Sequence, residues 1–459
     1  MSENKTQVIY EKKSFFEKVG KEIVEAAYEY ANGYMRFLDI AKTEREAVEE
    51  SVRMAEAAGY SAYSFGMPLK AGDKLYYNNR GKNIFLFKIG TEPINNGIRI
   101  TGAHIDSPRL DLKQSPVYEE ADMCYLKTHY YGGIRKYQWL TLPLALHGVV
   151  VKENGEAVNI TIGEKESDPV LYITDLLPHL ASAESAKTVS QAFQGEKLNL
   201  LVGSRPYEGV EKDAVKMGVL HYLYETYGIV EEDFLSAELS VVPAGKARDL
   251  GFDRSMICGY GHDDRVCAYP SITAMIDADE TLHTTMCILI DKEETGSDGV
   301  TGMQSDLVMD LITEISKALG GNEATVRANS KCISSDVAAT FDPAFADVYE
   351  KRNSALINCG VAMCKFTGSR GKGGTSDASA ELVAWIRRVL NEAGVVWQTC
   401  ELGKIDAGGG GTIAKYMANH NIDTIDLGVS VLSMHAPYEV ISKADLYEAY
   451  RAFRAFYNF

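Results

Sequence analysis

The chain has 459 residues, of which 46% are hydrophobic, and its formal net charge at pH 7 is −17. A chain of this length can form two or three domains with cores of their own. The acidic balance, without a basic block or a basic helix, argues against nucleic acid and against an anionic membrane as partners.

Cysteine usage and the N-terminus indicate the compartment. The eight cysteines are scattered, several inside apolar runs, and none forms a CxxC pair. This pattern predicts reduced thiols and not a disulfide framework or a zinc knuckle. The N-terminal stretch MSENKTQVIYEKKSFF lacks an apolar signal core, and no apolar run approaches the roughly 18 residues of a membrane helix. We therefore expect a soluble, cytoplasmic protein.

Helices and short strands are predicted for the N-terminal part of the chain. Residues 13–58 are expected to be helical. Thr43 and Glu46 have the spacing of a capping box at the start of one helix, and Gly59 lies at its end. Strands are predicted at KLYYNN, at NIFLFKIG and at 98–101.

The middle of the chain, residues 110–242, has a different pattern. Apolar and polar segments alternate, and one helical stretch near 213–226 interrupts them. From residue 243 the alternation of helices and strands resumes, and Ser442 and Asp445 are predicted to form a capping box for the last helix. The sequence therefore predicts a discontinuous α/β domain, 1–109 and 243–459, with a mostly β domain inserted in it.

The stretch Asp291–Gly299, DKEETGSDG, directly follows the apolar run Met286–Ile290. This order indicates a buried strand whose end reaches a cleft. Two adjacent glutamates, Glu293 and Glu294, would be costly to bury there unless a cation or a proton neutralised them. Taken alone, such a pair is more often a solvated helix face.

His104 and Asp106 have the spacing that places two side chains on one face of an extended segment. In a metal site, a carboxylate at Asp106 could fix the ring of a ligating His104. The alternative is a surface turn. Asp263 and Asp264 offer a carboxylate that could bridge two cations, or they form an ion-pair cluster with Arg265 at a helix start.

Two further candidates, Asp336 and His435, follow apolar segments. A lone histidine after such a strand is more often a structural, hydrogen-bonded residue. Functional loops of open α/β sheets lie at the carboxyl ends of strands. We expect the six candidates to meet there: His104, Asp263, Glu293, Glu294, Asp336 and His435.

These residue types together suit a dinuclear metal centre. Three carboxylates and two histidines, with one carboxylate bridging, would give each of two ions three protein ligands and an open side for water. Such ions polarise a carbonyl and acidify water, and one more carboxylate must then act as general base. A pair of adjacent glutamates supplies one ligand and one base.

Five segments carry a resemblance to a known family. In chain order they are TGAHIDSPRLDLK, Tyr131-Gly132-Gly133 with Trp139, DKEETGS, DAGGGGTIAKYM and GVSVLSMHAPYE, which together span residues 90–440. They resemble the aspartyl aminopeptidase and aminopeptidase I family of dizinc exopeptidases. The resemblance implies a three-layer α/β metallopeptidase domain with a mixed sheet. Residues 110–242 would be an oligomerisation or lid domain, and the assembly would be a homo-oligomer, a tetrahedral dodecamer.

The resemblance also implies the role of each candidate. One metal would be held by His104, Asp263 and Asp336, and the other by Asp263, Glu294 and His435; Glu293 would be the general base, and Asp106 would orient His104. Asp263 is the expected bridge because the family's ligand is the first member of its pair. Both ions would be divalent, with zinc the first choice and cobalt or manganese the alternatives.

The chain departs from the family's pattern at positions that bear on acidic specificity. An Asp-Arg that follows the Trp is replaced by Leu140–Pro143, and histidines are missing from 338–343. Ala183 stands where a substrate-contacting His is expected, although His179 is retained. These departures leave the preferred N-terminal residue open.

Two glycine-rich loops are candidates for contacts with the substrate. An acidic N-terminal side chain would need a basic partner. Lys372, in the loop 368–374, is the first candidate, with Arg370 the second; the alternative is a solvated surface loop. Gly409 and Gly410 belong to a nest-like glycine run and are expected to line the substrate cleft.

The sequence therefore predicts a metal-dependent aminopeptidase that releases N-terminal residues, with Asp and Glu as candidates, from short peptides through a metal-activated water. Two other functions stay open. One is a deacylase of N-acyl amino acids on the same dinuclear scaffold, and the other is a non-catalytic assembly protein.

Overall fold

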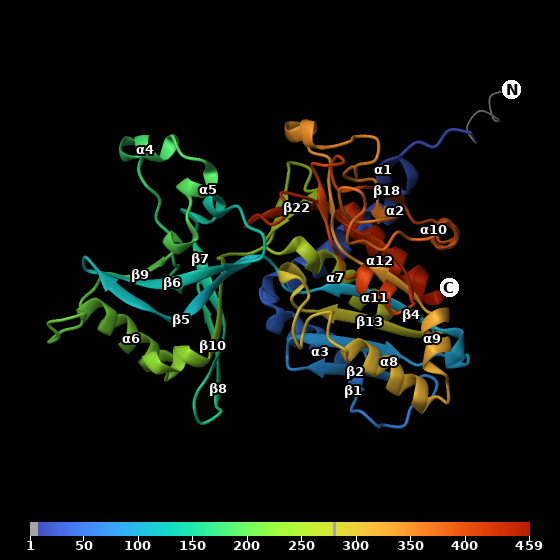
Figure 1. Ribbon diagram of the computed structural model, residues 1–459, viewed down its shortest axis with the longest axis horizontal. Helices are drawn as coiled ribbons and strands as arrows, with labels where there is room; N and C mark the ends of the chain where they lie inside the picture. The colour runs from blue at the N-terminus through green and yellow to red at the C-terminus, as the bar shows by residue number, and fades with distance from the viewer. Residues whose placement is uncertain (1–7, 279–280) are drawn as a thin grey trace. The chain divides into compact units, whose positions relative to one another are not determined.

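The computed structural model describes residues 8–278 and 281–459, which form two compact units (Figure 1). The first unit comprises the described residues up to Asp106 together with Ala247–Met434 and Glu439–Phe459. The second comprises Ser107–Lys246 and His435–Tyr438. The two ends of the chain thus build one unit, and most of the other comes from the middle.

A nine-stranded sheet forms the centre of the first unit. In spatial order its strands are β1 (Ser61–Ala62), β2 (Lys74–Asn79), β3 (Asn83–Lys88), β13 (Thr284–Ile290), β4 (Ile98–His104), β14 (Lys331–Ser334), β20 (Asp423–Gly428), β16 (Val361–Cys364) and β18 (Trp397–Thr399). The central strands β13, β4, β14 and β20 are parallel neighbours, whereas β3 and β16 pair antiparallel on either side. The predicted mixed sheet is confirmed.

Helices cover both faces of this sheet (Figure 1). Side chains alternate along β13: Met286 and Ile288 pack with one set of helices, whereas Cys287 and Leu289 pack with the other. The first set is α8 (Leu307–Ala318), α9 (Glu323–Asn329) and α11 (Ala414–Asn419). The second set is α2 (Lys21–Ile40), α3 (Glu44–Ala57), α7 (His262–Asp277), α10 (Ala380–Glu392) and α12 (Lys443–Asn458). The three predicted layers are therefore present.

Smaller elements complete the first unit. A five-stranded sheet has the order β11 (Arg248–Leu250), β12 (Met256–Gly259), β22 (Glu439–Ser442), β21 (Ser430–Leu432) and β15 (Ala338–Ala339). A two-stranded ribbon pairs β17 (Gly368–Ser369) with β19 (Gly409–Gly410). The remaining helical segments are α1 (Phe15–Lys18), η1 (Ile94–Asn96), η6 (Glu293–Thr295) and η7 (Pro343–Val348).

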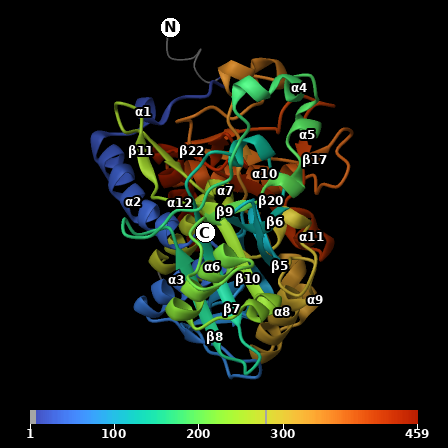
Figure 2. The ribbon, with the colours of Figure 1, turned by 90° about the vertical axis from the view of Figure 1, so that its left-hand side faces the viewer.

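The second unit is an antiparallel six-stranded sheet with one long helix. Its strand order is β8 (Ala157–Ile162), β7 (Leu144–Val151), β10 (Ala237–Pro243), β5 (Arg109–Glu120), β6 (Met123–Tyr131) and β9 (Leu200–Gly203). Helix α6 (Ala214–Tyr227), predicted near 213–226, packs against β5, β6 and β9 (Figure 2). The short segments are η2 (Lys136–Trp139), η3 (Pro178–Leu180), α4 (Ser182–Ser185), α5 (Val189–Ala192), η4 (Gly195–Lys197) and η5 (Glu231–Ser236).

Helix α3 begins at the predicted capping box. The hydroxyl of Thr43 accepts the N–H of Glu46, and the Glu46 carboxylate accepts the N–H of Thr43 at 2.9 Å. Gly59, expected at the helix end, has a positive φ of 84°. Within the described ranges 8–278 and 281–459, no helix combines the length and the apolar character that a membrane crossing requires.

The capping box predicted for the last helix is only half correct. Ser442 caps α12 as expected, because its hydroxyl accepts the N–H of Asp445. The Asp445 carboxyl, however, accepts the N–H groups of Asn358 at 2.9 Å and Gly360 at 2.7 Å. These long-range hydrogen bonds, which fix the chain before β16, therefore replace the expected bond between the Asp445 carboxyl and the N–H of Ser442.

Candidate metal centre

Three parallel neighbours of the large sheet end beside the predicted site residues. β4 ends at His104, β13 ends three residues before Glu293, and β14 ends two residues before Asp336. The carboxyl ends of parallel strands share one edge of a sheet. The expected meeting of these strand ends is therefore observed.

Asp263 and His435 come from the smaller sheet. Asp263 follows β12 at the start of α7, and His435 follows β21 and belongs to the second unit. The expectation that all six candidates follow strands of one open sheet is wrong for these two. The five-stranded sheet has strands of only two to four residues, too short for a periodic sequence signal.

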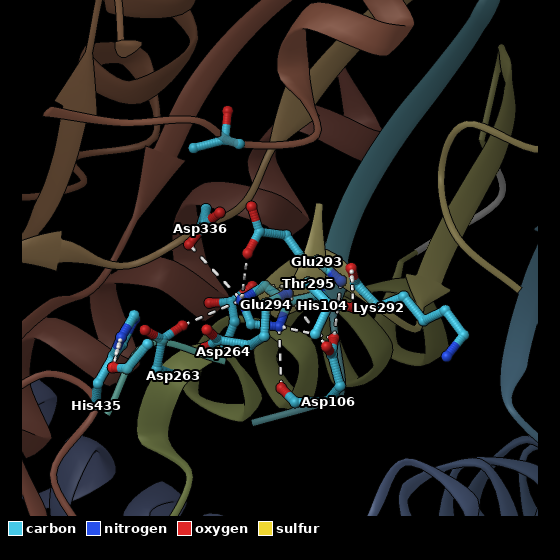
Figure 3. A network of polar contacts seen from close by, with 12 residues as sticks. His104, Asp106, Asp263, Asp264, Lys292, Glu293, Glu294, Thr295, Asp336 and His435 are labelled. Atoms are coloured by element: carbon cyan, nitrogen blue, oxygen red, sulfur yellow. Dashed lines mark hydrogen bonds and ion pairs between the residues drawn. The ribbon is translucent and has the colours of Figure 1, made fainter. Parts of the chain in front are cut away.

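Asp106 holds two parts of the site together (Figure 3). Nδ1 of His104 lies 3.2 Å from the Asp106 carboxylate and 3.0 Å from its main-chain carbonyl. The same carboxylate accepts the N–H groups of Glu293 and Glu294, both at 3.2 Å. Because Asp106 is fully buried, it fixes both the imidazole ring and the turn that carries the two glutamates.

The other ring nitrogen of His104 faces carboxylates. Nε2 lies 3.0 Å from Asp263 Oδ1 and 4.0 Å from oxygens of Glu293 and Asp336. Without a cation, a proton on Nε2 would bond to Asp263; in the neutral ring, with Nδ1 donating to the acceptors on Asp106, Nε2 would carry the lone pair. This is the orientation that a metal-ligating histidine needs.

The donor atoms form three overlapping groups that could each hold a metal ion. The groups are His104 with Glu293 and Asp336, His104 with Asp263 and Glu294, and Asp263 with Asp264 and Asp336. His104, Asp263 and Asp336 each belong to two of them. His435 belongs to none of the three groups found among the residues that the structure describes.

Burial and mutual repulsion disfavour the ionised acids in the absence of a cation. Burial is the main cause that raises the pKa of Asp336 well above its ordinary value, and the charges of Glu293 and Asp263 add to it. Burial alone would lower the pKa of His104, but its hydrogen bonds to Asp106 and Asp263 raise it well above the ordinary value. A divalent cation would relieve this repulsion, and imidazole with carboxylates is a donor set that suits zinc.

The two neighbouring aspartates have different surroundings. Asp264 is fully buried, and its carboxyl accepts the main-chain N–H of His104 at 3.3 Å. Asp263 instead directs Oδ1 at the imidazole, while its own N–H donates to the buried Glu439 carboxylate at 3.0 Å. Sequence reasoning gave Glu439 no role, although it is the last residue of the motif GVSVLSMHAPYE.

His435 has a fixed ring orientation of its own. Its Nδ1 donates to the carbonyl oxygen of Gly133 at 2.8 Å. Both residues belong to the second unit. A carbonyl can only accept, so Nε2 is the nitrogen that carries the lone pair in the neutral ring, as in His104.

The predicted substrate contacts lie outside the three donor groups. The Lys372 ammonium is 2.7 Å from Asp377 and 3.9 Å from the centre of the Phe366 ring. Gly409 and Gly410 form β19 of the two-stranded ribbon. His179 is an exposed residue of η3 in the second unit.

Comparison with known proteins identifies the class of this site. A model of the family "Aminopeptidase I zinc metalloprotease (M18)" matches residues 37–457. A "Probable M18 family aminopeptidase 1" from Clostridium acetobutylicum is 50% identical over 460 residues, 98% of this chain and 99% of that protein. The counterpart from Thermotoga maritima is 45% identical over 456 residues, 97% and 98% of the two chains.

Solved structures agree with the sequence comparison. A crystal structure of an M18-family aminopeptidase from Thermotoga maritima has a TM-score of 0.93 at 43% identity, with 98% of this chain and 100% of that chain covered. A Saccharomyces cerevisiae structure described as a dodecamer shares the fold. It has 21% identity and a TM-score of 0.76, with 93% of this chain and 96% of that chain covered.

The fold and the cluster of acids and imidazole thus define a metal-dependent hydrolase. The chain belongs to the aminopeptidase I zinc metalloprotease family, M18. It is a metal-dependent aminopeptidase, which confirms the predicted function and the predicted zinc at the level of the family.

Gly428 keeps the main chain of Asp336 in place. A Cβ atom at Gly428 would lie 2.0 Å from the carbonyl oxygen of Asp336. We expect Gly428→Ala to displace Asp336 and weaken zinc binding about tenfold, the lower end of the usual effect of residues that support metal ligands. Zinc titration of metal-free protein would measure this. Gly20→Ala, where a Cβ meets nothing within 4 Å, should bind as the wild type does; equal affinity of both variants would contradict the prediction.

Proposed function

We propose that this protein removes single residues from the N-terminus of short peptides at a dinuclear zinc centre. The proposed ligands are His104, Asp263 and Asp336 for one ion, and Asp263, Glu294 and His435 for the other. The observation that supports this arrangement best is that Asp263 belongs to two donor groups and directs Oδ1 at His104 Nε2 from 3.0 Å; Asp336 also belongs to two groups but lies 4.0 Å from that nitrogen. A carboxylate between two groups is what a bridging ligand requires. His435 stays a predicted ligand.

Glu293 is the proposed general base. Its side chain is 18% exposed, compared with 2% for His104, so it can reach both water and a peptide. Bound zinc ions would polarise the scissile carbonyl and acidify a water molecule. Glu293 would take the proton of that water and deliver it to the leaving amine. Asp106 positions the base through the N–H of Glu293.

A substrate panel with and without a chelator tests this function. The panel consists of anilides and short peptides with Asp, Glu, Leu, Ala or Lys at the N-terminus. We expect the protein to hydrolyse the substrates of at least one of these residues. A chelator should abolish this hydrolysis. Acetylation of the same substrates should abolish cleavage, because an aminopeptidase must recognise a free α-amine. Cleavage of only the acetylated set would favour the deacylase, and cleavage of neither set by zinc-loaded protein would overturn the proposal.

The same panel addresses acidic specificity, for which Lys372 is the proposed basic partner. Its ammonium already pairs with Asp377 at 2.7 Å. The acidic N-terminal side chain of a substrate would therefore have to displace Asp377 from Lys372. The net gain in binding free energy would be only the difference between two similar ion pairs. Gly409, Gly410 and His179 remain predicted contacts with the substrate.

We further propose that the protein assembles as a homo-oligomer, specifically a tetrahedral dodecamer, and works in the cytoplasm. The second unit exposes large apolar side chains that a partner could bury: Leu176, Leu177, Leu180, Tyr222 and Tyr224. The eight free cysteines suit a reducing compartment.

A further inference from the structure

Cys364 and Cys400 are direct neighbours although 36 positions separate them in the chain. Their sulfur atoms lie 2.8 Å apart. Cys364 ends β16, and Cys400 follows β18 directly. These strands are parallel neighbours in which Met363 is paired with Thr399, so the two cysteines are the next pair in register.

The strand pairing sets a spacing that suits a covalent bond. Adjacent strands lie about 4.7–4.9 Å apart, and disulfides accept Cα separations of about 4.4–6.8 Å. The N–H of Cys400 donates to the carbonyl of Met363 at 3.0 Å, which holds the strands together at this point. Bridging the two sulfur atoms would therefore need little movement of the backbone.

This pair differs from the other cysteines. In the part of the chain that the structure describes, no other two cysteines are in sulfur–sulfur contact. The possible metal-binding groups found among the described residues contain neither Cys364 nor Cys400. Two thiols in contact, with no third metal ligand, are suited to redox chemistry and not to a structural metal site.

The two cysteines also lie where two glycine-rich loops begin. From Cys364 the chain continues to β17, and from Cys400 it continues to β19. These strands pair with each other through Gly368 and Gly410. A bond between the two sulfur atoms would thus link the bases of two loops that already pair further along.

We propose that Cys364 and Cys400 are a redox modification site that hydrogen peroxide converts into a reversible disulfide. The Cys364 thiolate attacks a peroxide oxygen, the O–O bond breaks, and the hydroxide that leaves takes a proton to become water. Cys400 then attacks the resulting sulfenic sulfur; the S–S bond forms, the S–O bond breaks, and a second water leaves. Two electrons pass from the two thiols to the peroxide. This inference does not depend on the proposed peptidase mechanism.

Access and ionisation determine the order and the speed of these steps. Cys364 is the more exposed residue of the pair, since Cys400 is only 4% exposed, and we therefore take Cys364 as the first to be oxidised. The hydrogen bond with Cys400, together with burial, raises the pKa of the Cys364 thiol well above its ordinary value. Because the thiolate is the reacting form, the disulfide should form slowly at neutral pH and faster at alkaline pH.

The test uses the full-length, zinc-loaded protein and hydrogen peroxide. After oxidation, unfolding in an alkylating reagent should show that the number of reactive thiols falls from eight to six. Peptide mass mapping should show a cross-link between Cys364 and Cys400 that dithiothreitol reverses. The oxidised protein should also unfold at a temperature several degrees higher, because the bond closes a long loop.

Variants separate this pair from general oxidation. Cys364→Ser and Cys400→Ser should each abolish the cross-link, whereas Cys258→Ser, at another partly exposed cysteine, should retain it. The mapping of the wild-type protein needs no variant and decides the matter alone. Eight remaining thiols, loss of two other thiols, or Cys364 oxidised further without a cross-link would overturn the proposal.

Discussion

Glu293→Gln should fold and bind zinc as the wild type does, yet lose about 100- to 10,000-fold in kcat, the range that general acid–base catalysis contributes. Glutamine has nearly the same shape, and the N–H of residue 293 can still donate to Asp106, which accepts it at 3.2 Å. What the amide cannot do is take a proton from water. Steady-state kinetics on a cleaved anilide, together with zinc analysis of the same sample, measures both parts of this prediction.

Glu294→Gln is the matched control. Both glutamates lie in donor groups with His104, Glu293 together with Asp336 and Glu294 together with Asp263, and Asp106 accepts the N–H of each. Only Glu294 is a metal ligand in the proposed arrangement. Its loss should therefore lower the zinc content as well as the rate, and excess zinc should restore part of the activity. A Glu293→Gln enzyme that works near the wild-type rate would show that another group is the base.

Local patterns predicted the edge of the large sheet at which His104, Glu293 and Asp336 lie. Three strands of this sheet end at a candidate site residue or within a few residues of one. His104 is the last residue of β4, and Glu293 and Asp336 follow β13 and β14 closely. An apolar run followed by acids is visible without any knowledge of distant contacts. Because β4, β13 and β14 are parallel neighbours, the rule for open α/β sheets then predicted that these side chains meet.

Features that depend on contacts between distant segments could not be predicted from the sequence. The Asp445 carboxyl bonds to Asn358 and Gly360, 87 and 85 positions away, and not within its own helix turn. Asp263 follows β12, a strand of four residues in a second sheet. No sequence period reveals strands this short, and a local rule cannot rank a capping bond against a distant one.

The cysteine pair shows the same limit in another way. Cys364 and Cys400 meet only because β16 and β18 are neighbours in a given register. Scattered cysteines inside apolar runs correctly predicted that most of these thiols are buried. Which two of them touch is a property of strand order, which composition and spacing do not determine.

The second large effect concerns the two aspartates that start α7. Asp263→Asn should lower zinc affinity by more than about 100-fold, since loss of a ligand must exceed the 10- to 100-fold that supporting residues cost. Asp263 is the proposed bridge between the two ions, so both should be affected together. Activity at low zinc should fall in parallel. Zinc counted per chain after dialysis, followed by back-titration, measures the effect.

Asp264→Asn makes the same chemical change one residue further along the chain. Its amide oxygen can still accept the N–H of His104, which the Asp264 carboxyl accepts at 3.3 Å, so this variant should retain most of its zinc. The comparison therefore isolates the bridging role from the loss of a negative charge. If Asp264→Asn lost both ions and Asp263→Asn kept them, Asp264 would be the bridge, and the contact between Asp263 and His104 would serve to orient the ring.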